Sequence, residues 1–152
     1  MSQAAKPALT SAPRILVVGP SWVGDMVMAQ SLFLTLKQRW PDSHIGVVAP
    51  GWSQPILERM EEVSEVFGLD VGHGEFGWSA RRQLAHRLRG RFDRAIVLPR
   101  SWKSALVPFL ARVPQRTGFT GEQRYGLLND RRRLDKAVLD QTVKRFVALG
   151  LN

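Results

Sequence analysis

The 152-residue sequence contains no cysteine, which excludes disulfides, thiol nucleophiles and thiolate metal sites and suits a reducing compartment. Histidine is scarce, and its few copies have no spacing typical of metal ligands, so we expect no metal site. No apolar run is long enough to cross a bilayer. Residues 1–13 lack the apolar core of a signal peptide, and we interpret them as a disordered leader. The histidines are His44, His73 and His86.

Acidic residues are also few, and the two halves of the chain carry opposite charge balances. Residues 1–75 hold 5 Lys and Arg against 8 Asp and Glu, whereas residues 76–152 hold 17 against 5. The balances are therefore −3 and +12, which together give the net charge of +9. A basic half suggests an anionic partner, such as nucleic acid, anionic lipid or an acidic or phosphorylated sugar. The alternative is a surface that is merely rich in arginine.

Short apolar runs alternate with amphipathic segments, which predicts strands alternating with helices. For example, Met26, Ala29, Phe33, Leu36 and Trp40 step by three and four and form one apolar stripe of a helix. This alternation is typical of an α/β fold, a parallel sheet with right-handed crossovers and helices on both faces. We expect strands at 14–19, 44–49, 63–69 and 93–98, a short edge strand at 113–119, helices at 25–40, 53–60, 78–89 and 135–149 and one from 101 onward, and a polar loop at 120–133.

The most informative segment is the turn Gly19-Pro-Ser-Trp-Val-Gly24, which joins the first strand to the first helix and leads directly to Asp25. It is neither the three-glycine dinucleotide fingerprint nor a P-loop. In open α/β sheets, ligands bind outside the carboxyl ends of the strands, so this turn places a carboxylate and free N–H groups where chemistry occurs. The alternative is that Asp25 is only a helix-start carboxylate favoured by the helix dipole.

Three further cations are candidates for ligand binding. Lys103 follows the strand at 93–98 and opens a helix in which Pro108 implies a kink or a later start. A lysine in a first helical turn is slightly unfavourable, so a ligand could explain it, although a solvated lysine is the alternative. Arg116 and Arg124 lie in a glycine-containing segment, 116–126, that we interpret as a long loop; arginine suits carboxylate or phosphate, or the loop is simply exposed and basic.

The predicted helix at 78–89 and its exit carry an unusual number of arginines. Basic residues with Trp78 nearby are consistent with a membrane surface or with nucleic acid, and equally with a solvated helix face. The arginines are Arg81, Arg82, Arg87, Arg89, Arg91 and Arg94.

Several short blocks, in this order, resemble the ADP-heptose:lipopolysaccharide heptosyltransferases of glycosyltransferase family 9. The resemblance runs from about Arg14 to Leu149 with almost no gaps, and the blocks together are far more specific than any one of them. The blocks are Gly-Pro-Ser-Trp-Val-Gly-Asp-Met (19–26), Gly-His-Gly (72–74), Lys-Ser-Ala-Leu-Val-Pro-Phe (103–109), Arg-Thr-Gly (116–118) and Arg-Tyr-Gly-Leu-Leu-Asn-Asp (124–130).

The resemblance implies half of a GT-B enzyme, which consists of two Rossmann-like domains. Residues 14–152 would be the Rossmann-like, acceptor-binding N-terminal domain, and the C-terminal ADP-sugar domain would lie outside this chain. Such an enzyme transfers L-glycero-D-manno-heptose from ADP-heptose to the first heptose of the lipopolysaccharide inner core. It works in the cytoplasm, peripherally at the inner face of the inner membrane of a Gram-negative bacterium, with no metal and no cofactor besides the donor. We therefore expect the 152 residues alone to be inactive.

The resemblance also assigns roles to individual residues. Asp25 would be the catalytic general base, and Gly24 would belong to a donor-facing turn. The acceptor carries Kdo carboxylates and lipid A phosphates, which suit cationic and polar side chains. We expect no nucleic-acid partner; the alternative function is a basic α/β module that binds nucleic acid or nucleotide. The expected acceptor-binding residues are Lys103, Arg116, Arg124, Ser21 and Trp22.

Overall fold

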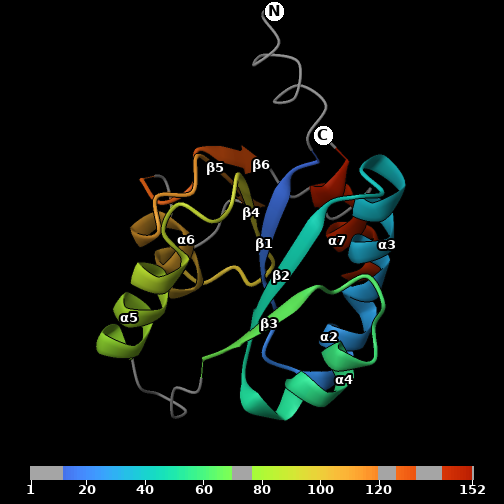
Figure 1. The fold of residues 1–152 in the computed structure, drawn as a ribbon, viewed down its shortest axis with the longest axis horizontal. Coiled ribbons are helices and arrows are strands. Elements are labelled where there is room, and N and C mark those ends of the chain that lie inside the picture. The colour runs from blue at the N-terminus through green and yellow to red at the C-terminus, as the bar shows by residue number, and fades with distance from the viewer. Residues whose placement is uncertain (1–11, 70–76, 120–125, 133–141, 152) are drawn as a thin grey trace, which may run out of the picture.

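A six-stranded parallel sheet forms the centre of the protein (Figure 1). The computed structural model describes residues 12–69, 77–119, 126–132 and 142–151. The strands lie in the order β3-β2-β1-β4-β5-β6. The first strand is therefore central: β2 and β3 follow on one side of it, and β4, β5 and β6 follow on the other. The strands are β1 (Arg14–Val18), β2 (His44–Ala49), β3 (Glu65–Gly68), β4 (Arg94–Val97), β5 (Gln115–Phe119) and β6 (Asp130–Arg132).

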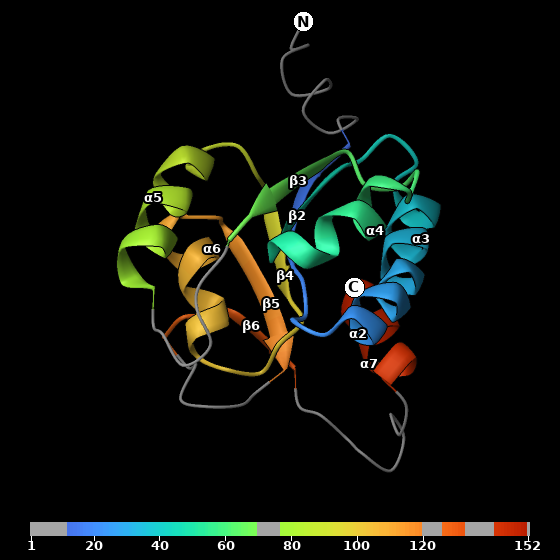
Figure 2. The same ribbon diagram turned by 90° about the horizontal axis from the view of Figure 1, so that it is seen from below.

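Helices cover both faces of the sheet, as Figure 2 shows from below. Helices α2, α3, α4 and α7 lie on one face, and α5 and α6 on the other. This arrangement confirms the predicted α/β class with a parallel sheet between helical layers. The helices are α2 (Val23–Met28), α3 (Gln30–Arg39), α4 (Gln54–Glu58), α5 (Trp78–Leu88), α6 (Leu106–Leu110) and α7 (Thr142–Gly150), with 3₁₀ turns η1 (Gly51–Ser53) and η2 (Lys103–Ala105).

Strand β1 contributes to both hydrophobic cores because its side chains alternate between the two faces of the sheet. Ile15 and Val17 pack with the core under α2, α3, α4 and α7, whereas Leu16 packs with the core under α5 and α6. All three side chains are fully buried. A continuous apolar run is what a parallel strand covered on both faces requires.

The helix predicted at 25–40 is wrong in one respect, because the structure divides it at Ala29 into α2 and α3. The Ala29 N–H bonds to the carbonyls of both Asp25 and Met26, at 2.9 and 3.2 Å, which tightens the turn. The Ser31 hydroxyl also donates to the Met28 carbonyl at 2.7 Å. Hydroxyl groups that bond back to helix carbonyls disturb the regular helix, which explains the interruption.

The edge strand predicted at 113–119 is also wrong, because β5 is an inner strand with β6 beside it. The edge strand β6 lies in the segment 120–133, which we had predicted to be a loop. Polar side chains hold this pair together: the Thr117 hydroxyl donates to Asp130 Oδ2 at 2.8 Å, and Gln115 Nε2 donates to the same oxygen at 3.2 Å. Hydrophobic periodicity cannot reveal a strand whose pairing is polar.

The remaining predicted elements are present; β2 has the predicted bounds, and the bounds of the others are shifted. Pro108 lies in the first turn of α6, so the helix starts later, after η2, and the later start is confirmed. The helix predicted at 135–149 is present as α7, and its first predicted residues lie outside the described part of the chain. In the described ranges, every helix is too short or too polar to cross a membrane.

A cluster of charged side chains joins the amino ends of β2 and β3. His44 Nε2 donates to Glu65 Oε2 at 2.6 Å, and Arg91 Nη2 donates to both Glu65 oxygens at 3.0 and 2.9 Å. The Arg91 guanidinium also lies over the rings of Phe67 and Phe92. The hydrogen bond from His44 and then that from Arg91 hold the pKa of the Glu65 carboxyl below its ordinary value, although partial burial opposes them.

We expect Glu65→Gln to lower the free energy of unfolding by about 1 kcal/mol at neutral pH, because the charged hydrogen bonds are lost. Glu65 has a lowered folded pKa, so its contribution is full above the unfolded pKa of about 4.3 and is lost as the pH falls through the folded value. The difference between the two proteins should therefore shrink below about pH 4. Urea unfolding at several pH values measures it, with the exposed Glu58→Gln as control. An equal loss in the control, or a pH-independent difference, contradicts the assignment.

Candidate functional site

The site is built between the neighbouring strands β1 and β4, where the order in which the chain adds strands to the sheet reverses. After β1 the chain leads to α2 on one face, and after β4 it leads to α6 on the other face (Figure 2). The two connections therefore diverge, and a crevice opens at the carboxyl ends of these strands. In open α/β sheets this switch point is where ligands bind.

Asp25 lies at this edge in the first turn of α2. Trp22 is the N-cap residue, and its carbonyl accepts the first helical hydrogen bond from Met26 N–H at 2.9 Å. The Asp25 side chain is partly exposed, and among the described residues we find no hydrogen bond to its carboxylate. A partly exposed carboxylate on a short, well-bonded turn can accept a proton from a bound hydroxyl group.

A pocket of about 150 Å³ opens beside this turn, between the carboxyl ends of β1, β2 and β4. It collects three serines and one arginine from three separate segments, which are the turn after β1, helix α5 and the segment after β4. Polar groups that converge on one pocket are typical of a ligand site. The lining residues are Val18, Gly19, Ser21, Val48, Ala49, Pro50, Trp52, Leu69, Arg81, Pro99, Ser101 and Ser104.

Arg81 provides the positive charge of this pocket, and it extends there from α5. Its Nη1 donates to the Lys103 carbonyl at 3.4 Å, which joins α5 to the segment after β4. Burial lowers the pKa of the Arg81 guanidinium below its ordinary value, since charge is less stable away from water. In the sequence, Arg81 is only one of the basic residues of its helix, and nothing there predicts that it lies at the site.

Trp52 was missed entirely by the sequence analysis. It lies in η1, directly after β2, and its indole Nε1 donates to the Ser21 carbonyl at 2.9 Å. This bond joins the segment after β2 to the turn that carries Asp25. The side chain is nevertheless 59% exposed, and Trp22 is 71% exposed at the same edge. The sequence signal that could have identified Trp52 is its position directly after Pro50-Gly51, at the carboxyl end of β2.

The structure brings some of the predicted site residues together and separates others. Ser21 lines the pocket, and beside it are the exposed Trp22, the N-cap residue of α2, and the exposed Gly24, in the first turn of that helix. A Cβ atom at Gly24 would meet nothing within 4 Å, so packing does not require glycine there. Lys103 is the first residue of η2, after β4, and is partly exposed. Arg124 lies outside the described residues, as does His73.

Arg116 lies elsewhere, and the prediction that it belongs to a loop is wrong. It is the second residue of β5, beside Ala95 near the amino ends of the strands. Its Nε donates to the Leu127 carbonyl at 2.7 Å and its Nη1 to the Val113 carbonyl at 2.9 Å. Burial lowers its pKa, and its guanidinium stabilises local backbone at the end of the sheet opposite Asp25.

Comparison with known proteins finds similar sequences and similar structures. Residues 81–151 match the model of "Glycosyltransferase family 9 (heptosyltransferase)". The chain is 57% identical over 138 residues to lipopolysaccharide heptosyltransferase 2 of Salmonella typhimurium and 56% identical over the same length to that of Escherichia coli. Each match covers 90% of this chain and 40% of the relative, so the chain spans about two fifths of the length of these curated relatives.

Solved structures agree with the sequence matches. The structure of ADP-heptose lipopolysaccharide heptosyltransferase II from E. coli superposes with a TM-score of 0.83 at 52% identity, covering 91% of this chain and 40% of that one. A family 9 glycosyltransferase from Veillonella parvula superposes with a TM-score of 0.79 at 20% identity, covering 90% and 40%, which shows the shared fold alone. In the sequence of residues 81–151, and in sequence and fold over nine tenths of its length, the chain is similar to heptosyltransferases of glycosyltransferase family 9.

Proposed function

We propose that this chain forms the acceptor-binding part of a heptosyltransferase. The enzyme transfers L-glycero-D-manno-heptose from ADP-heptose to the first heptose of the lipopolysaccharide inner core. The observation that carries the proposal is the 57% identity to a lipopolysaccharide heptosyltransferase 2 over 90% of the chain. The geometry supports it, since the turn that leads to Asp25 borders a pocket with polar groups at the switch point of the sheet.

In this proposal Asp25 is the general base. As the acceptor hydroxyl oxygen attacks the anomeric carbon of the donor from the face opposite ADP, Asp25 takes the hydroxyl proton. A new glycosidic C–O bond forms, the bond from the anomeric carbon to the phosphate oxygen breaks, and ADP leaves with the electron pair. The chemistry as proposed needs no metal and no cofactor besides the ADP-heptose donor. Gly24 would lie in the part of the turn that faces this donor.

The acceptor would lie across the same edge of the sheet. Its carboxylates and phosphates are suited to Arg81 in the pocket and to Lys103 after β4. Ser21 would supply a hydroxyl group and Trp22 an exposed ring to the sugar. Arg124 stays a proposed acceptor contact on the basis of the family resemblance alone. Because this acceptor is lipid-linked, we further propose that the protein works in the cytoplasm, peripherally at the inner membrane.

Asp25→Asn should lower heptosyl transfer by roughly 100- to 10,000-fold, because the hydroxyl proton loses its acceptor. The measurement is release of ADP from ADP-heptose in the presence of heptosylated Kdo–lipid A, using the longest chain that the gene encodes. The exposed Asp42→Asn, at the other end of the sheet, is the matched control. The 152 residues alone should bind the acceptor without transfer. Transfer by the 152 residues alone, or an active Asp25→Asn enzyme, contradicts the assignment.

Trp52→Phe should lower kcat about tenfold with little change in KM. The variant removes the hydrogen bond from Trp52 to the turn that leads to Asp25 but keeps an aromatic ring at this position. Trp52→Ala should also raise KM if the exposed ring contacts the sugar. Steady-state kinetics with a water-soluble acceptor separate the two effects, and Trp78→Phe, at an exposed tryptophan on α5, is the control. Unchanged kinetics in Trp52→Phe would show that the hydrogen bond from Trp52 to the Ser21 carbonyl does not position Asp25.

A further inference from the structure

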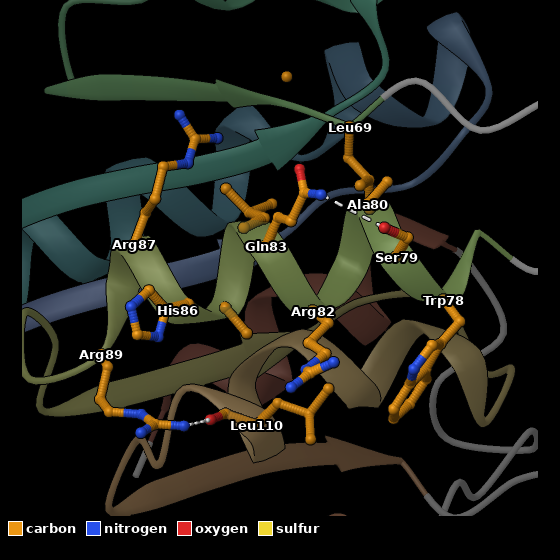
Figure 3. A pocket seen from close by; sticks show the side chains of 13 residues that line it. Leu69, Trp78, Ser79, Ala80, Arg82, Gln83, His86, Arg87, Arg89 and Leu110 are labelled. Carbon is orange, nitrogen blue, oxygen red and sulfur yellow. Dashed lines mark hydrogen bonds between the residues drawn. The ribbon is translucent and has the colours of Figure 1, made fainter.

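A second surface of the protein lies along the outer side of α5, and its groove shares only Leu69 with the site pocket. Figure 3 shows Trp78, Arg82, His86 and Arg89 along one side of this helix, with Leu110 of α6 beside them. They line an open groove of about 1080 Å³. The opposite side of the helix is apolar, and its Leu84, Ala85 and Leu88 side chains pack in the core between the helix and the sheet.

The groove continues onto α6. A second hollow of about 440 Å³ is lined by Phe109 and Arg112, and it shares Arg89 and Leu110 with the first. Arg89 Nη2 also donates to the Leu110 carbonyl at 3.3 Å, so the two helices form one continuous surface. We call it the α5–α6 face. It comprises Trp78, Arg82, His86, Arg89, Phe109 and Arg112, all of which are exposed.

The charge of this face has one sign. Neither the stretch 77–92, which contains α5, nor the stretch 106–114, which contains α6, includes an aspartate or a glutamate. The face therefore complements an anionic surface. Two large aromatic side chains lie among its cations, since Trp78 is 46% exposed and Phe109 is 39% exposed.

We propose that the α5–α6 face docks the protein on a bilayer that contains anionic lipid. Arginines attracted to lipid phosphates, with tryptophan and phenylalanine inserted at the level of the headgroups, are the residue types of an interfacial helix. Nucleic acid would also attract the arginines, but its binding does not require exposed Phe109. The aromatic side chains favour the membrane.

This inference deepens the proposed function, because a lipid-linked acceptor presents its sugars at such a surface. Only the connection to the lipid-linked acceptor rests on the proposed function. The positive charge and the exposed aromatic side chains of the face do not depend on it. Binding to vesicles is measured without any transfer. Failure of docking therefore leaves heptosyl transfer untouched, and failure of transfer leaves docking untouched.

The test is cosedimentation of the 152-residue chain with vesicles of phosphatidylethanolamine and phosphatidylglycerol. Each arginine near an anionic surface contributes about fivefold to partitioning, so Arg82→Gln/Arg112→Gln should weaken binding roughly 25-fold. The matched control is Arg59→Gln/Lys144→Gln, which removes the same charge on the opposite face of the sheet and should change binding little. Trp78→Ser should weaken binding several-fold without any change in charge.

Three outcomes overturn the proposal. Equal losses in the double variant and the matched control show that only net charge matters. Equal binding to vesicles of phosphatidylcholine alone shows that anionic lipid is not recognised. Tighter binding to a DNA or RNA duplex than to the vesicles, lost in Arg82→Gln/Arg112→Gln but kept in Trp78→Ser, assigns the face to nucleic acid instead. Circular dichroism of each variant establishes that it is folded.

Discussion

The rest of the structure depends on the burial of β1 between two helical layers. Ile15, Leu16 and Val17 are completely buried, and they belong to two separate hydrophobic cores. Coverage on both faces is typical of a strand in a parallel sheet, and β1 pairs in parallel with β2 and β4. Because the segments after β1 and β4 then diverge toward opposite faces, the crevice between them follows from the burial of one apolar run. Asp25 is near that crevice because it comes eight residues after Val17, the last fully buried position of β1, by way of one short turn.

The protein separates two kinds of positive charge. Arg81 lies in the pocket at the switch point, where burial lowers its pKa and the Lys103 carbonyl accepts a hydrogen bond from it. Arg82, the next residue, lies on the exposed side of the same helix. One turn of α5 can therefore present a cation to a bound ligand and another to an extended anionic surface. On this account, the excess of arginine in residues 76–152 supports both ligand binding and docking.

The sequence could predict the strand-turn-helix unit around Asp25, because an apolar run, a glycine turn and a periodic helix are local patterns. It could not predict that Trp52 and Arg81 meet at the same pocket, since only the strand order brings their segments together. The edge strand β6 escaped notice because its residues, Asp130–Arg132, have no apolar alternation and pair through polar side chains. Arg116 was placed on a loop for the same reason, and its pairing in β5 directs the guanidinium to backbone carbonyls.

The central claim is that the acceptor binds where the segments after β1 and β4 diverge. The most direct measurement is NMR titration of the 152-residue chain with a water-soluble, heptosylated Kdo oligosaccharide. The account predicts saturable shifts confined to the amides of residues 21–25 and 101–104 and to the indole N–H of Trp52. Shifts confined to α5, or to the opposite edge of the sheet around Arg116, or the absence of saturable shifts, would contradict it.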